Sequence, residues 1–257
     1  MGWSNDDPAI GATNDFGHGG SSWSAIPGAA LGFELATSAR LLGGYGWMEQ
    51  RLFEVLGSWV ASEPVAEACV LFDMMSRQHA WHAELCFDRL PLIGGRYDPS
   101  LARAPSSGVV DLLEALGGLD APAGSDHPDP ASSQGASSQG ASSQSASSQG
   151  GGTLLRLVGL GRVVLPRLVV TYRAHLGRAS VAADLAVARA LRLIVRDEIE
   201  EWQMVELLVQ SLLRRPHDVA VVSAHQQSLE SMIVGAGPGL VSMPGAGVQA
   251  LLTYPLD

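Results

Sequence analysis

Residues 31–60, LGFELATSARLLGGYGWMEQRLFEVLGSWV, carry the pattern that decides the fold. Alternating steps of four and three residues give a mostly apolar stripe, the spacing that keeps one helix face against a partner. A bare carboxylate within such a stripe costs several kcal/mol. We therefore expect the one carboxylate in it to be paired, neutralised or bound to a metal. The stripe consists of Leu31, Leu35, Ser38, Leu42, Tyr45, Glu49, Leu52, Leu56 and Trp59.

The composition indicates a globular chain with a substantial core and a net negative charge. The 257 residues are 46% hydrophobic and 16% charged, and the formal net charge is -10. Nucleic acids and anionic membranes are bound through positive charge, so neither is an expected partner. All 16 basic residues are arginine, which excludes Schiff-base chemistry and a phosphate loop ending in Gly-Lys. The heavy use of Ala, Gly and Arg is typical of a GC-rich bacterial genome.

The sequence favours a cytoplasmic location. Residues 1–20 contain three aspartates and no apolar run, unlike a signal peptide. An uninterrupted apolar run of about 18 residues, as a membrane span needs, is also lacking. Cys69 and Cys86 are predicted on one helix, about 25 Å apart at 1.5 Å per residue, which is too far for a disulfide.

Helical periodicity divides the chain into an N-terminal segment, a bundle and a C-terminal part. Residues 1–27 are rich in Gly, Ser, Asn and Asp and are predicted to be disordered. The bundle is predicted over 28–215, and 216–257 is predicted as a C-terminal helix and an apolar tail. The expected helices cover 28–61, 64–89, 153–176, 181–214 and 217–234. The Gly43-Gly44 pair inside the first helix predicts a close neighbour or a kink, and Pro166 predicts a kink in the third.

Residues 91–152 are predicted to form a flexible crossover insert within the bundle. Four pentads related to Ala-Ser-Ser-Gln-Gly begin at Ala131, Ala136, Ala141 and Ala146. Small polar residues of this kind cannot bury a core. A short helix is expected nearer the start of the insert, over 109–116.

Further polar residues interrupt the apolar stripes of two other helices. His79 and His82 lie together on the stripe of 64–89, and Glu198 and Glu201 lie on that of 181–214. The helix over 153–176 contains no Asp or Glu. Its Tyr172 and His175 are interpreted as ordinary core and helix-end residues.

With two helix pairs joined by a long crossover, the chain resembles the ferritin-like superfamily, and the fold expected is an all-α, ferritin-like four-helix bundle with a short C-terminal helix. The family places a Glu on its first and third helices and a Glu-x-x-His pair on its second and fourth. Glu49 matches the first of these. His79-Ala-Trp-His82 keeps the second-helix His and replaces its Glu, whereas Glu198-Ile-Glu-Glu201 keeps the fourth-helix Glu and replaces its His. The third-helix Glu is absent.

The resemblance implies a metal site, and the sequence leaves a metal-free alternative open. The candidate ligands are Glu49, His79, His82, Glu198 and Glu201, which suit one iron or manganese ion better than two. The same residues would otherwise form a relic network of hydrogen bonds and salt bridges, with Arg77, Arg192 and Arg196 as neutralising partners.

Two classes of function follow. The resemblance implies a non-haem metal oxidoreductase that carries out oxygen-dependent oxidation or hydroxylation of a small hydrophobic substrate. The alternative is a non-catalytic bundle that acts as a structural or interaction protein. A homodimer is the oligomer expected if the chain self-associates.

Overall fold

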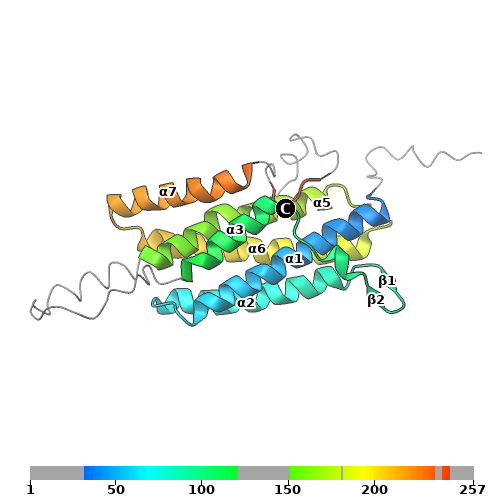
Figure 1. Ribbon diagram of the computed structural model, residues 1–257, viewed down its shortest axis with the longest axis horizontal. Coiled ribbons are helices and arrows are strands. Elements are labelled where there is room, and N and C mark those ends of the chain that lie inside the picture. The colour runs from blue at the N-terminus through cyan, green and yellow to red at the C-terminus, as the bar shows by residue number, and fades with distance from the viewer. Residues whose placement is uncertain (1–31, 121–150, 181, 235–238, 244–257) are drawn as a thin grey trace, which may run out of the picture.

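The computed structural model describes residues 32–120, 151–180, 182–234 and 239–243. In these ranges the chain is all-α, as predicted, apart from one two-stranded hairpin (Figure 1). The N-terminal segment 1–27, the pentad repeat and tail residues 244–257 lie outside the described ranges. The long helices are α1 (Leu35–Val60), α2 (Ala66–Phe87), the segment 151–176 and α6 (Leu185–Leu212), followed by α7 (Pro216–Met232).

The first helix begins later than its periodicity predicts. It was expected from residue 28, but residues 32–34 are not helical and α1 starts at Leu35. Gly32 has a φ of 74°, in the left-handed region, and a Cβ there would lie 2.7 Å from Asp184 Oδ2. A continuous helix therefore cannot pass through this position. As a result Leu35, expected on the buried stripe, is 72% exposed.

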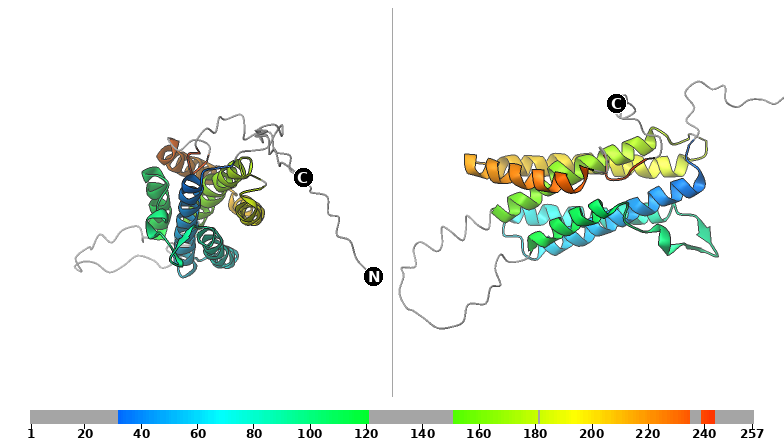
Figure 2. Two further views of the ribbon diagram at one scale, coloured as in Figure 1. Left: turned by 90° about the vertical axis from the view of Figure 1, so that its right-hand side faces the viewer. Right: turned by 45° about the horizontal axis from the view of Figure 1, so that its top comes forward.

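The long helices alternate in direction around the core. Along α1 and α2 the contacts pair Val60 with Cys69 and Phe53 with Ser76, so these helices are antiparallel. The 151–176 segment is antiparallel to α1, because Arg156 contacts Glu63 near one end and His175 contacts Tyr45 near the other. Viewed end on, α1 lies between α2, α3 and α5 (Figure 2).

A π-helical turn interrupts the 151–176 segment where a kink was predicted. Residues 151–158 are α-helical, η4 (Gly159–Val164) is π-helical, and α5 (Leu165–Leu176) resumes with Pro166 in its first turn. A proline cannot donate to the preceding turn, and a π turn relieves that conflict. Gly161 also lets this turn approach α6, since a Cβ there would lie 2.5 Å from Val205 Cγ1.

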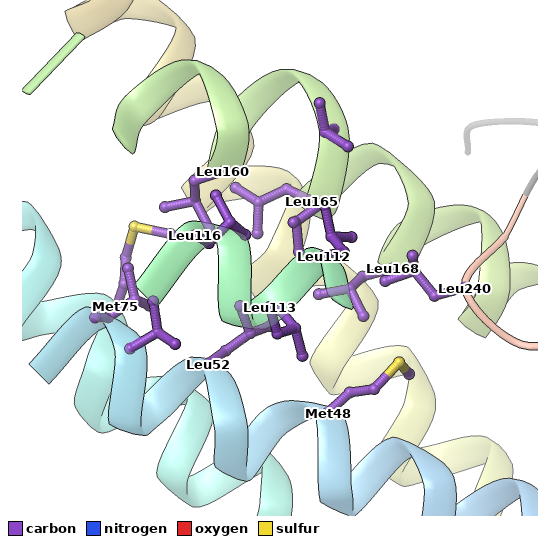
Figure 3. Packing of buried hydrophobic residues seen from close by; sticks show 14 of the residues in the cluster. Met48, Leu52, Met75, Leu112, Leu113, Leu116, Leu160, Leu165, Leu168 and Leu240 are labelled. Atoms are coloured by element: carbon purple, nitrogen blue, oxygen red, sulfur yellow. The ribbon is translucent and has the colours of Figure 1, made fainter. Parts of the chain in front are cut away.

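The first half of the expected crossover insert, residues 91–120, is structured and contributes to the core. It contains β1 (Leu92–Ile93) paired antiparallel with β2 (Arg96–Tyr97), then η2 (Pro99–Leu101), α3 (Ser107–Gly117) and η3 (Gly118–Asp120). In α3 the side chains of Leu112, Leu113 and Leu116 are at most 1% exposed. They lie between α1 and the 151–176 segment (Figure 3). The short helix predicted over 109–116 is therefore confirmed as a core element.

The C-terminal part also contacts the core. The backbone N–H of Leu240 donates to Thr171 Oγ1 at 2.9 Å, and Leu240 and Met243 are buried. Among the helices in the described ranges, none is both long enough and apolar enough to cross a membrane.

The Gly43-Gly44 pair allows a prediction with a built-in control. A Cβ on Gly43 would lie 2.1 Å from the carbonyl oxygen of Leu101, whereas one on Gly44 would make an ordinary contact, 3.4 Å from Pro105. Gly43→Ala should lower the free energy of unfolding by about 1–3 kcal/mol through overpacking. Gly44→Ala should leave it unchanged or raise it by up to about 1 kcal/mol through helix propensity. Urea unfolding of both variants measures this, and equal effects would contradict the close approach at Gly43.

Candidate metal centre

The five side chains predicted as ligands meet in the interior. Glu49 comes from α1, His79 and His82 from α2, and Glu198 and Glu201 from α6. Each is at most 1% exposed. The i, i+3 spacing of each pair places both members on the helix face that points into the core.

Glu49 and the two imidazoles form the centre of the cluster. The Nδ1 of His79 donates to Glu49 Oε2 at 2.5 Å. The Nδ1 of His82 lies 3.6 Å from the same oxygen and 3.2 Å from Glu198 Oε1. His79 Nδ1 is also 3.6 Å from Glu198 Oε1. Two carboxylate oxygens and two imidazole nitrogens therefore face one small volume.

One ligand atom from each of Glu49, His79, His82 and Glu198 makes a group in which all atoms lie within 4.8 Å of one another. Ligand bonds to iron, manganese or zinc are about 2.0–2.2 Å long, so two ligands of one ion are at most about 4.4 Å apart. A small inward movement of the side chains would therefore bring all four atoms into bonding distance of one ion. Glu201 is not part of this group. Its Oε2 lies 3.5 Å from His79 Nε2, on the outer side of that ring.

Several polar atoms here have no hydrogen-bond partner among the described residues. They include both oxygens of Glu198, both oxygens of Glu201 and the Nδ1 of His82. Buried polar atoms in folded proteins are nearly always satisfied. The unsatisfied Glu198 oxygens and His82 nitrogen are the donor types that a cation binds, so these residues fit a metal ion.

Two further residues contact the ligands and were not predicted as site residues. The Nε2 of His82 donates to Asp197 Oδ2 at 3.2 Å, which leaves Nδ1 to face the cluster. The hydroxyl of Tyr172 in α5 donates to Glu49 Oε1. Interpreting Tyr172 as ordinary core was therefore incomplete. The signals in the sequence were the acidic neighbour of Glu198 and a phenol on the only long helix without a carboxylate.

The arginines proposed as neutralising partners lie elsewhere. Arg77 forms an ion pair with Asp73 on the surface of α2, and Arg196 forms one with Glu200 on the surface of α6. Arg192 is exposed. Within the described part of the chain, the positive charge that faces the buried carboxylates comes from the two histidines.

The electrostatics of the metal-free cluster follow from burial and from these contacts. Burial would raise the pKa of Glu49, but His79 and His82 outweigh it and lower that pKa to about 2. Burial would lower the pKa of His79, but Glu198, Glu201 and Glu49 raise it to about 9. The pKa of His82 rises in the same way, against burial, to about 11 through Glu198 and Glu49. Burial raises the pKa of Glu201 to about 8, and burial and Glu49 raise that of Glu198.

A second buried polar pair lies one turn along the same interface. Tyr45 is hydrogen-bonded to His175 Nδ1 at 3.1 Å, and its ring packs edge-on against Tyr172 with centroids 5.0 Å apart. Burial lowers the pKa of His175 to about 4. His175 is therefore neutral near pH 7 and adds no charge to the cluster.

Asp197 gives the cluster its nearest approach to solvent. Its side chain is 20% exposed, whereas those of the residues it adjoins in the cluster are at most 1% exposed. A groove of about 740 Å³ lies on another face of α6, where Ile199, Trp202 and Leu207 contribute to its lining and the cluster residues do not.

Comparison with known proteins adds no assignment, since no protein-family model, curated protein or solved structure matches the chain.

The metal-free protein should lose stability as the pH rises above about 6.5, because below that pH the lowered pKa of His175, about 4, acts in the opposite direction to the raised pKa of Glu201. Glu201 has a folded pKa of about 8 against an ordinary value of 4.5, and His79 has about 9 against 6.5. The folded state therefore retains protons that the unfolded state has lost. The free energy of unfolding falls by about 1.4 kcal/mol per pH unit for each such proton, from pH 4.5 to 8 for Glu201 and from 6.5 to 9 for His79. Urea unfolding in the presence of a chelator measures this slope.

Glu201→Gln should flatten the slope between pH 4.5 and 8, because the amide does not titrate. Glu200→Gln is the matched control, since Glu200 pairs with Arg196 on the surface of the same helix. A wild-type stability that is constant or rises between pH 6.5 and 8 would contradict the electrostatics described above.

Proposed function

We propose that this protein binds one divalent transition-metal ion through Glu49, His79, His82 and Glu198. The observation that carries the proposal is the convergence of four ligand atoms from three helices within 4.8 Å of one another, all fully buried. Two imidazoles and two carboxylates suit iron, manganese or zinc. The resemblance of the bundle favours iron or manganese.

The contacts around the imidazoles support metal binding. Histidines that bind metals usually donate their second ring N–H to a carboxylate or carbonyl, which fixes the tautomer and the ring orientation. Asp197 has this relation to His82 at 3.2 Å, and Glu201 faces the outer nitrogen of His79 at 3.5 Å. In both cases the Nδ1 atom is the ring nitrogen that faces the other ligands.

The directions of the long helices support a ferritin-like arrangement. The cross-helix contacts make α2 antiparallel to α6, since His79 meets Glu201 and His82 meets Glu198. Because α1 is antiparallel both to α2 and to the 151–176 segment, the latter two run in the same direction. A chain that joins two parallel helices must travel back along the bundle, as the long crossover of the ferritin-like superfamily does.

For the activity, we propose oxygen-dependent oxidation or hydroxylation of a small hydrophobic substrate. This step rests on the ferritin-like resemblance and on a ligand set that suits a redox-active metal. The bound ion would supply the chemistry with dioxygen. The residues of this chain would hold the ion, fix the imidazole orientation and exclude bulk water from the centre.

A non-catalytic bundle is the second candidate, and two observations favour it. In the metal-free state the imidazolium groups of His79 and His82, whose pKa values are raised to about 9 and about 11, supply positive charge beside the carboxylate of Glu49 without an ion. In addition, the groove on α6 is not lined by the cluster residues. Under this hypothesis the cluster only stabilises the core, and the protein acts through partners.

Metal binding is tested first by titration of chelator-treated protein with Mn²⁺. The wild type should bind one ion per chain, and His82→Ala should weaken binding by more than about 100-fold, since losing even an outer partner of a ligand costs 10–100-fold. His175→Ala is the matched control, because it removes another buried imidazole outside the ligand group. Equal binding by the wild type and His82→Ala, or none by the wild type, would refute the proposed site.

Oxygen uptake separates the two candidate functions. Anaerobic protein loaded with one Fe²⁺ per chain should consume dioxygen faster than the same Fe²⁺ in buffer, and His82→Ala should return the rate to the buffer value. An oxygen electrode and the ultraviolet absorbance of Fe³⁺ follow the reaction. Stoichiometric metal without accelerated uptake would favour the non-catalytic bundle.

A further inference from the structure

The two oxygens of Glu49 have different environments. Its Oε2 faces the imidazoles, 2.5 Å from His79 Nδ1 and 3.6 Å from His82 Nδ1. Its Oε1 accepts the hydroxyl of Tyr172, a fully buried residue from the opposite side of the interface. Only Oε2 is therefore directed at the proposed ion, and Oε1 is already occupied by a neutral donor.

The side of Glu49 that faces α5 offers little to a second ion. The 151–176 segment has no Asp or Glu, and it contacts Glu49 through Tyr172, which is fully buried. Tyr45 covers Tyr172 edge-on and is itself hydrogen-bonded to His175. A divalent cation here would meet phenol and hydrocarbon groups without a charged ligand, which is a costly environment for a buried ion.

Glu201, the remaining carboxylate of the cluster, cannot supply the charged ligand that a second ion would need. Glu201 lies beyond the ring of His79, at Nε2, whereas Glu49 lies at Nδ1 of the same ring. Because the two ring nitrogens point apart, a second ion could not bind both Glu49 Oε1 and Glu201. The first ion would also take the charges of Glu49 and Glu198.

We propose that Tyr172 is a positioning residue that holds Glu49 with only Oε2 toward the imidazoles and thereby limits the centre to a single ion. This inference rests on the proposed metal site. It goes beyond that site in assigning a residue that does not touch the ion and in giving a structural reason why one ion binds.

Tyr172→Phe tests the positioning, because it removes the hydroxyl and keeps the ring. Its affinity for Mn²⁺ should fall by about 10-fold or more, in the range found for partners of metal ligands. Tyr45→Phe is the matched control, because it also removes a buried hydroxyl at the same interface but one bonded to His175. The affinity of Tyr45→Phe for Mn²⁺ should stay within about twofold of the wild type. Both variants lose a buried hydrogen bond, and they should unfold at similar temperatures.

The wild-type full-length protein tests the number of ions without any variant. With excess Mn²⁺, it should bind one ion per chain and give the electron paramagnetic resonance spectrum of isolated ions. Two ions per chain with a coupled spectrum, or an unchanged affinity in Tyr172→Phe, would overturn the role of Tyr172 while leaving the metal site intact. A wild type that binds no Mn²⁺ would instead refute the metal site itself, and this inference with it.

Discussion

The structure depends on how the charge of Glu49 is compensated in the middle of the core. The side chain is fully buried and faces groups from three other helical segments: the histidines of α2, Tyr172 of α5 and, beyond the imidazoles, the carboxylates of α6. An uncompensated carboxylate here would cost more than most single packing contacts supply. The long helices must therefore keep one register, because sliding α2 by a single turn would take His79 away from Glu49.

This requirement also accounts for the small residues around the centre. Because Gly43 has no side chain, the backbone at Leu101 can pack closely against α1. In the same way, Gly161 lets the π-helical turn pack against Val205 of α6. Side chains at these positions would move neighbouring elements outward and lengthen the contacts between the polar groups. Close packing outside the cluster and close contacts inside it are thus consequences of the same helix spacing.

The sequence predicted the cluster more fully than it predicted its surroundings. Glu49, His79, His82, Glu198 and Glu201 all break apolar stripes, and a stripe must face the core, so their meeting could be anticipated. Asp197 could not, because it lies about 100° around α6 from Glu198, and whether it reaches His82 depends on helix spacing and tilt. Tyr172 was missed because an aromatic side chain is expected in an apolar stripe, and the partner of its hydroxyl depends on how the helices pack. Residues 91–120 were assigned to the flexible insert because the low-complexity repeat follows them directly in the sequence.

The same arrangement suits a metal ion and its absence, because protons on the imidazoles and a bound cation are alternative sources of positive charge beside the carboxylates. Without an ion, the imidazolium groups of His79 and His82 face the carboxylates of Glu49 and Glu198, while Glu201, with its raised pKa of about 8, is neutral near pH 7. A divalent ion in their midst would displace one proton from each imidazole, so two protons leave as two positive charges arrive. Folding can then precede metal binding, since the polypeptide neutralises its own core.

Charge balance alone thus does not separate a relic network from a working centre. The Glu198 oxygens without a hydrogen-bond partner and the contact between Asp197 and His82 are compatible with a bound cation, and they support the proposed metal centre over the relic network.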